Sequence, residues 1–198
     1  MALRIGITGG MGSGKTTVAE IFKVLGIPVF NADKAAKELM ETDTKLQLAI
    51  KEQFGENCYQ DGKLNKKLLA AIVFNDPYQL EKLNSMVHPL TIAEAEVWAG
   101  KQTTPYTLKE AALFFEAGTA IGFDYMVGVF APKHLRIKRV VERDQLTKVE
   151  VELRMKRQIS EEIKMKLCDF VILNDDQHLL IPQVLKLHER FLEESTKN

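Results

Sequence analysis

The apolar residues of the N-terminal part change their spacing along the chain. Apolar and other residues alternate over residues 3–8, which predicts a short strand. From Val18 to Leu25 they recur at helical spacing, and Gly26 follows as a helix stop. The run IPVF (27–30) is typical of a second buried strand. Helices are predicted next, at about residues 34–40 and 46–54, so this part alternates β and α.

The rest of the chain predicts three more strands and two helical segments. After a turn-rich stretch at 55–63, the apolar spacing up to about residue 101 is helical, without a clear strand. Strands are predicted at 106–116, 125–131 and 169–174, and a last helix opens at Pro182. Five strands separated by helices predict an α/β fold with a parallel, doubly wound sheet.

Composition narrows the class of partner. The 198 residues are 45% hydrophobic and 27% charged, and 27 Lys and Arg balance 27 Asp and Glu. This balance does not favour nucleic acid or a membrane surface, so a small molecule is the expected partner. No apolar run approaches the roughly 20 residues of a membrane span, and we expect a cytoplasmic protein. Cys58 and Cys168 are far apart, with no histidine at metal-ligand spacing, so both are expected to be reduced, without a zinc site.

The stretch GGMGSGKTT, residues 9–17, carries the clearest chemistry. Gly9, Gly14, Lys15 and Thr16 fit the pattern G-x-x-x-x-G-K-[ST] between a predicted strand and a predicted helix. Glycines let backbone N–H groups turn toward a phosphate, the helix N-terminus is positive, and the lysine adds a cation. The threonine hydroxyl is a ligand for Mg²⁺. We therefore expect ATP and Mg²⁺ as cofactors, the latter bound at Thr16, with nucleotide contacts from Gly10, Gly12, Ser13, Gly14, Lys15, Thr16 and Thr17.

Other features favour a kinase over other phosphate-binding proteins. Lys15 stands where a dinucleotide-binding pattern requires a glycine, and no NKxD-type guanine motif is present. The third predicted strand ends in LFFE with Glu116, whereas many ATPases and GTPases end it in an aspartate that holds Mg²⁺. Asp33 follows the second strand, and parallel strands end on one side, so its carboxylate is expected near the glycine loop. There it would accept a proton from an attacking hydroxyl.

An ordered set of motifs resembles the dephospho-coenzyme A kinases over essentially the whole chain. The set is GITGGMGSGKTTVA, NADKAAKEL, DGKLNKKLL…VF, the pair His88 and Pro89, LFFE, RVVERD and DFVILN. The resemblance implies one P-loop kinase domain of the nucleoside monophosphate kinase type, with five parallel strands flanked by helices. It divides into a core (1–58, 102–135, 168–198), a helical coenzyme-A-binding insertion (59–101) and a mobile helical lid (136–167).

The resemblance also implies a reaction and roles for residues. ATP would phosphorylate the ribose 3′-hydroxyl of dephospho-coenzyme A, the last step of coenzyme A synthesis. The implied catalytic residues are Asp33, Lys15 and Arg143, and Arg139 and Asn174 join the nucleotide contacts. The acceptor would contact Lys66, His88, Pro89, Leu113 and Glu116. The chain departs from the family pattern where DAD is Asn31-Ala32-Asp33, where an arginine is Lys66, and where PLLFE is Ala112 to Glu116.

Several of these residues have simpler explanations that the residues alone leave open. Asp33 could be only a helix N-cap. Arg139 and Arg143 lie four residues apart in a densely charged segment, and such segments usually form solvated helix faces. His88 was expected to end one helix before Pro89 begins another, where a capping role is an alternative. Another small-molecule kinase, acting on a nucleoside monophosphate or gluconate, and a non-enzymatic nucleotide switch are the rival functions.

Overall fold

A computed structural model describes residues 2–74 and 76–197, which form two compact units. The first unit, here called the sheet unit, comprises residues 1–31 and 102–198. The second, the helical unit, comprises residues 32–101 and includes the whole of the expected insertion 59–101. In the part of the chain that the structure describes, no helix is both long and apolar enough to cross a bilayer.

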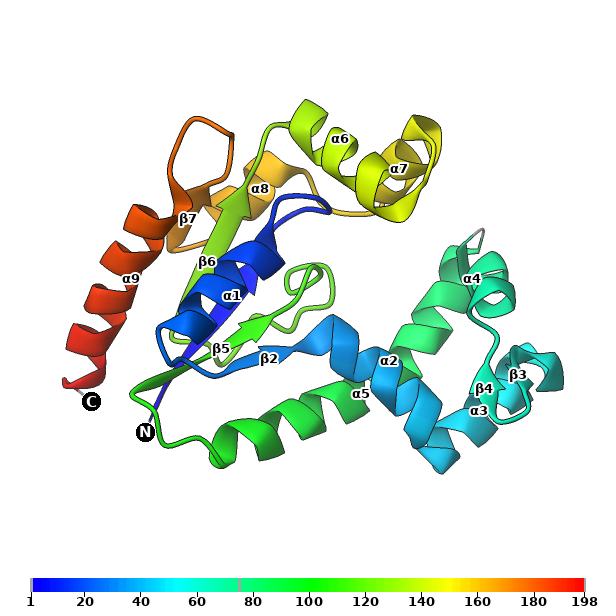
Figure 1. The fold of residues 1–198 in the computed structure, drawn as a ribbon. Helices are drawn as coiled ribbons and strands as arrows, with labels where there is room; N and C mark the ends of the chain where they lie inside the picture. Colours follow the sequence, from blue (N-terminus) through cyan, green and yellow to red (C-terminus); the bar gives the residue numbers. More distant parts are fainter. Residues whose placement is uncertain (1, 75, 198) are drawn as a thin grey trace. The chain divides into compact units, whose positions relative to one another are not determined.

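The sheet unit is built on five parallel strands in the order β2-β5-β1-β6-β7 (Figure 1). The strands are β1 (Leu3–Thr8), β2 (Val29–Asn31), β5 (Tyr106–Glu110), β6 (Tyr125–Phe130) and β7 (Phe170–Leu173). The central strand β1 lies between β5 and β6, so the loop that follows β1 emerges from the middle of the sheet. This arrangement confirms the predicted five-stranded parallel α/β fold.

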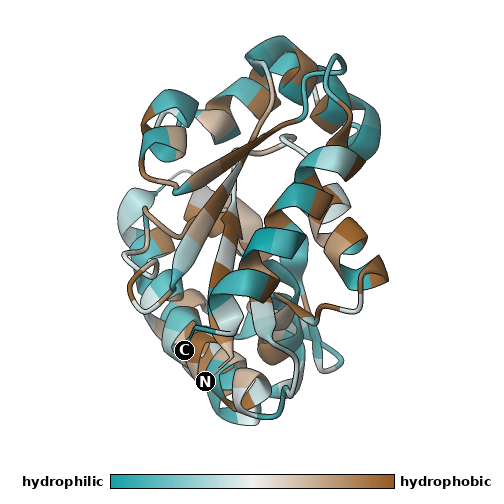
Figure 2. Ribbon diagram, turned by 90° about the vertical axis from the view of Figure 1, so that its left-hand side faces the viewer, coloured by the Kyte–Doolittle hydropathy of each residue, from teal (hydrophilic) through white to brown (hydrophobic). Residues whose placement is uncertain are grey.

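The helices of the sheet unit cover both faces of the sheet. They are α1 (Lys15–Val24), α6 (Lys133–Asp144), α7 (Lys148–Met155), α8 (Glu161–Lys166) and α9 (Leu180–Ser195). Val127 packs in one buried cluster with Phe22 of α1 and Phe191 of α9. Its neighbour Gly128 faces the other side of the pleat, where a Cβ would lie 2.7 Å from Met165 Sδ of α8. Helices in Figure 2 accordingly carry both apolar and polar bands.

The helical unit has a small core of its own. It comprises α2 (Ala32–Thr42), α3 (Thr44–Phe54), a 3₁₀ turn η1 (Glu56–Cys58), the strands β3 (Tyr59–Gln60) and β4 (Lys63–Leu64), α4 (Lys66–Phe74) and α5 (Pro77–Gly100). The buried cluster contains Leu46, Ile50, Cys58, Tyr59, Leu69, Leu83 and Val87. Because these residues pack on one another, the unit buries apolar surface without a large sheet.

Two details of the helical unit differ from the sequence prediction. No strand was expected there, but Asp61 and Gly62 adopt positive φ angles of 49° and 75° and close a two-stranded hairpin, β3–β4. A helix break was expected at His88 and Pro89, but α5 continues through both. Proline in a helix removes one backbone hydrogen bond, and the 24-residue length of α5 leaves the flanking turns intact.

The prediction of the third strand was wrong at its C-terminal end. Strand β5 stops at Glu110 rather than at residue 116. Backbone bonds from Ala117 N–H to Leu113 O and from Thr119 N–H to Phe114 O fold the following residues into turns. The apolar run there is explained by burial, because Phe114 is fully buried outside any strand. Strand β2 is likewise displaced from the predicted 27–30 to 29–31.

Candidate nucleotide-binding site

The phosphate loop, residues 9–16, connects β1 to α1 in the sheet unit. Gly12 and Gly14 have φ angles of 78° and 94°, which glycine adopts without strain. Ser13 N–H donates to Gly10 O at 3.1 Å and closes a turn. Helix α1 begins at Lys15 with Gly14 as its N-cap, and no side chain of the described residues caps it. Its first N–H groups are therefore available to an anion.

Lys15 is buried, with 9% of its surface exposed. Its Nζ donates to Gly9 O at 3.0 Å and to Gly10 O at 3.3 Å, so the ammonium lies against the loop backbone. Helix α1 begins at the same residue, so the ammonium lies beside the positive N-terminal end of this helix. This position suits a bound phosphate.

Thr16 is held by a carboxylate that the sequence prediction missed. Its hydroxyl donates to Glu110 Oε1 at 2.6 Å, and Asn31 Nδ2 donates to Glu110 Oε2 at 2.8 Å. Glu110 is only 4% exposed, whereas Thr16 is exposed to solvent. The end of β5 thus places a buried carboxylate beside the hydroxyl expected to bind Mg²⁺. Hydroxyl and carboxylate oxygens are ligands that Mg²⁺ prefers.

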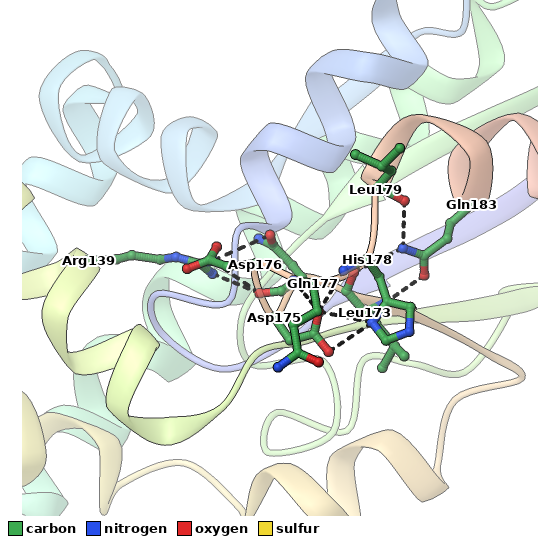
Figure 3. Close-up of polar contacts among 9 residues, drawn as sticks. Arg139, Leu173, Asp175, Asp176, Gln177, His178, Leu179 and Gln183 are labelled. Carbon is green, nitrogen blue, oxygen red and sulfur yellow. Dashed lines mark hydrogen bonds and ion pairs between the residues drawn. The ribbon is translucent and has the colours of Figure 1, made fainter.

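Asn174 and Arg139 form a second connection to the phosphate loop. Asn174 follows β7, and its Nδ2 donates to Ser13 O at 2.8 Å. Arg139 of α6 donates to the Asn174 carbonyl oxygen from both Nη1 and Nη2 at 3.1 Å. It also donates from Nη2 to Asp176 Oδ1 at 2.6 Å (Figure 3). Arg139 therefore contacts the loop after β7 and is not simply a solvated charge. Arg139 and Asn174 thus form a chain of hydrogen bonds from α6 to Ser13 of the phosphate loop.

The loop after β7 is fixed by further polar contacts, visible in Figure 3. The His178 ring and backbone N–H groups hydrogen-bond to Asp175 and lower the pKa of its carboxyl to about 2. The Gln183 side chain accepts from Leu173 N–H at 2.8 Å and donates to Leu173 O at 3.0 Å. These bonds give the loop a defined conformation next to Asn174.

The segment expected to be a lid also contacts the phosphate loop. Gly10 N–H donates to Glu161 Oε1 at 3.2 Å, and Met11 N–H donates to Gln158 Oε1 at 3.0 Å. Arg136 pairs with Glu161 at 3.0 Å, and both side chains are at least nine-tenths buried. The interpretation of the densely charged segment 133–166 as solvated helix faces is therefore wrong for Arg136 and Glu161, since their charges pair inside the protein.

Glu116 lies in the turns after β5, not at a strand end. Its carboxylate pairs with Lys164 at 2.9 Å and accepts from Ile159 N–H at 3.1 Å. Lys164 is fully buried and also donates to Ala112 O at 2.7 Å. Leu113 lies half-buried in the same turns. Glu116 thus fixes the conformation of the segment that contains Leu113.

Arg143 lies in the last turn of α6 and is largely exposed. It forms a bidentate hydrogen bond with the neighbouring Asp144, at 2.7 and 2.9 Å, which raises the pKa of its guanidinium. The predicted face shared by Arg139 and Arg143 exists on α6, but the structure directs the two side chains to different partners. Arg139 reaches the loop after β7, and Arg143 stays on its own helix.

The remaining predicted residues belong to the helical unit. Asp33 is exposed in the first turn of α2, which begins at Ala32, so it lies inside the helix rather than at the cap. Lys66 opens α4 and pairs with Glu41 at 2.7 Å beside a cavity of about 810 Å³. His88 is half-buried within α5, and Pro89 next to it is exposed.

Neither cysteine has the properties of a reactive thiol. Both are free, burial raises the pKa of Cys58, and burial with the nearby Asp169 carboxylate raises the pKa of Cys168 to about 12. Within residues 2–74 and 76–197, no group of three or more His, Cys, Asp or Glu side chains is arranged to hold a metal ion.

Comparison with known proteins identifies the family of this chain. The family model for dephospho-CoA kinase matches residues 3–179. A dephospho-CoA kinase of Bacteroides fragilis is 37% identical over 94% of this chain and 92% of its own length. One from Coxiella burnetii is also 37% identical, over 96% of this chain and 98% of its own.

Solved structures agree with the sequence comparisons. A protein from Thermus thermophilus has a TM-score of 0.84 at 30% identity, over 98% of this chain and 97% of that one. The dephospho-CoA kinase from Campylobacter jejuni has a TM-score of 0.71 at 26% identity, over 98% and 99% of the two chains. Shikimate kinase from Acinetobacter baumannii, at 16% identity and a TM-score of 0.51, shares the fold. The chain therefore belongs to the dephospho-CoA kinase family, whose members are P-loop kinases.

Proposed function

We propose that this chain transfers the γ-phosphoryl group of ATP to the ribose 3′-hydroxyl of dephospho-coenzyme A, giving coenzyme A and ADP. One observation carries the nucleotide half of this proposal. The uncapped N-terminus of α1, the positive φ angles of Gly12 and Gly14, and the buried Lys15 together suit a chain of phosphates. The acceptor half rests on the family to which the chain belongs.

The residues around the loop fit Mg-ATP. When bound, Mg²⁺ would neutralise charge on the β- and γ-phosphates. Thr16 would be its ligand, and Glu110 would hold the Thr16 hydroxyl in place. Ser13 Oγ is fully buried without a hydrogen-bond partner among the described residues, so the loop retains a polar atom that a ligand contact would satisfy. Arg139 and Asn174 would support the nucleotide from the loop after β7.

The chemical step assigns separate tasks to three residues. Lys15 would stabilise charge that develops on the transferring phosphoryl group. The Asp33 carboxylate would accept the proton of the ribose 3′-hydroxyl while the hydroxyl oxygen attacks the γ-phosphorus and ADP leaves. Arg143 would exchange its exposed partner Asp144 for phosphate oxygens when the exposed part of the proposed lid 136–167, the end of α6 and α7, moves toward the nucleotide. Arginine suits this exchange because its planar fork matches either anion.

Residues of both units are proposed to contact the acceptor. Lys66, His88 and Pro89 would contact dephospho-coenzyme A from the helical unit, where Lys66 lines the 810 Å³ cavity. Leu113 would contact it from the sheet unit. Because Glu116 is already paired with Lys164, we assign Glu116 to holding the Leu113 segment in shape. We expect the enzyme to act in the cytoplasm, without nucleic acid or membrane partners.

An acceptor screen tests the function. ADP release should be measured with ATP and Mg²⁺ alone, and then with dephospho-coenzyme A, nucleoside monophosphates or gluconate. The proposal expects release to depend strongly on dephospho-coenzyme A. A preference for another acceptor would indicate a different small-molecule kinase. GTP preference with slow hydrolysis that no acceptor accelerates would indicate a nucleotide switch.

A further inference from the structure

Residues 158–161, here called the strap, comprise the end of the α7–α8 connection and the first residue of α8, and they contact the phosphate loop. Gln158 accepts from Met11 N–H at 3.0 Å, and Glu161 accepts from Gly10 N–H at 3.2 Å. Two consecutive N–H groups of a nucleotide-binding loop are thus bound by side chains about 150 positions away in sequence. Neither residue belongs to the phosphate-binding motif.

The strap is itself fixed at both of its ends. Ile159 N–H donates to Glu116 Oε1, which pairs with the fully buried Lys164. At the other end, Glu161 Oε2 accepts from Arg136 NH1 at 3.0 Å, and both side chains are nearly buried. The Glu161 carboxylate is therefore held by an ion pair with α6, and the backbone next to Gln158 is held by Glu116.

The phosphate loop needs such external support because of its composition. Glycine loses more backbone entropy on ordering than any other residue, and the loop contains Gly9, Gly10, Gly12 and Gly14. A loop that is ordered before the ligand arrives does not have to be ordered at the expense of binding. Arg136 and Glu161 also pack directly on the Cα of Gly10, where a Cβ would collide with both side chains.

Electrostatics favour a supporting role over a blocking role. A lone carboxylate beside a phosphate site would repel the ligand. Glu161, however, is paired with the Arg136 guanidinium, and Gln158 carries no charge. The strap thus offers acceptor oxygens to the loop backbone while adding little negative charge near the nucleotide.

We propose that Gln158 and Glu161 are positioning residues for nucleotide binding, which hold the first turn of the phosphate loop in its ligand-ready shape. This inference rests on the proposed function for one point, that the ligand of the phosphate loop is ATP. Both residues act through the backbone of Gly10 and Met11, and neither needs to touch the phosphates.

The test compares three single variants with the wild-type chain. Gln158→Leu removes the acceptor for Met11 N–H. Glu161→Gln keeps an oxygen for Gly10 N–H but replaces the acceptor of Arg136 by an amide donor and removes the negative charge. Glu162→Gln is the matched control, because Glu162 is an exposed carboxylate in the same turn of α8. Affinity for Mg-ATP is measured by calorimetry, KM for dephospho-coenzyme A by the ADP-release assay, and Tm by thermal unfolding.

Gln158→Leu should weaken ATP binding by about 5- to 10-fold, the value of one lost hydrogen bond, and Glu161→Gln by about 3-fold. In both variants KM for dephospho-coenzyme A should stay close to the wild-type value. In Glu162→Gln the ATP affinity, this KM and Tm should all stay close to wild type. Wild-type ATP affinity in Gln158→Leu would overturn the proposal. Tighter ATP binding by Glu161→Gln would also overturn it, since the strap would then compete with phosphate.

A purely structural role gives a different pattern, which would also overturn the proposal. In that case Tm and kcat would fall with the fraction of folded protein, while ATP affinity of the folded fraction would not change. Calorimetry separates this test from the proposed function because it needs no turnover. If the wild-type chain binds ATP but does not phosphorylate dephospho-coenzyme A, the proposed function fails and the test of the strap still stands.

Discussion

Substitution of Glu110 by glutamine should disturb the Mg²⁺ ligand without removing it. The carboxylate accepts from both Thr16 Oγ1 and Asn31 Nδ2, at 2.6 and 2.8 Å. A carboxamide has one acceptor oxygen and one donor group. Asn31 Nδ2 can only donate, so it takes the oxygen. The Thr16 hydroxyl must then accept from the new amide, which engages one of its two lone pairs and turns its proton away from residue 110.

The size of the effect follows from the bond that is lost. A hydrogen bond to a charged group contributes about 1.5–3 kcal/mol. Thr16 is exposed, so water can form part of the lost hydrogen bonding, and we take the lower end of this range, about 1.5 kcal/mol. About 1.5 kcal/mol corresponds to roughly a tenfold loss in kcat/KM for ATP and a similar loss in apparent Mg²⁺ affinity. Glutamine preserves the buried volume, so Tm should fall by no more than about 2–4 °C.

A double-mutant cycle with Thr16→Val identifies the route of the effect. Initial rates of ADP formation are measured for the wild type, both single variants and the double variant, at several Mg²⁺ concentrations. If Glu110 acts through Thr16, adding Glu110→Gln to Thr16→Val should cost little more, which gives a coupling energy of about 1.5 kcal/mol. Losses that add to within about 0.5 kcal/mol would refute the reasoning, because independent sites behave in that way.

Three further predictions concern the other proposed roles. Lys15→Ala should lose several kcal/mol of transition-state stabilisation, measured as kcat/KM, and activity near wild type would contradict the role of Lys15. Asp33→Asn should lower kcat by roughly 10² to 10⁴ with ATP affinity and Tm nearly unchanged, whereas kcat within about threefold of wild type would remove Asp33 as the base. Amide hydrogen exchange in the segment 136–167, and in α7 above all, should slow when an ATP analogue binds, and unchanged exchange would exclude a lid.

Much of the fold follows from local sequence signals. The strand–glycine loop–helix unit at residues 3–24 was predicted because its periodicity and its motif agree, and the five-stranded parallel sheet followed from the alternation of strands and helices. The end of β5 was missed because apolar residues buried in turns, such as Phe114, resemble a continuing strand. The break at Pro89 was wrong because the length of α5 tolerates one missing hydrogen bond.

The phosphate loop was predictable from the sequence, but its supports were not. Lys15 and Thr16 belong to a motif with fixed spacing, so their neighbourhood follows from sequence alone. Glu110, Gln158 and Glu161 contact the loop from distant segments, and such contacts depend on tertiary packing. For Glu110 a local signal existed, since alternation from Tyr106 ends at this carboxylate before two alanines. For the strap no comparable signal is present.

The central claim is that this chain phosphorylates the 3′-hydroxyl of dephospho-coenzyme A. The most direct measurement is mass spectrometry of dephospho-coenzyme A incubated with ATP, Mg²⁺ and the purified protein, with phosphorus NMR to locate the new phosphate. We expect a product heavier by one phosphoryl group, esterified at the ribose 3′ position, formed far faster than ATP is hydrolysed alone. An unmodified acceptor, with ATP turned over equally well in its absence, would contradict it.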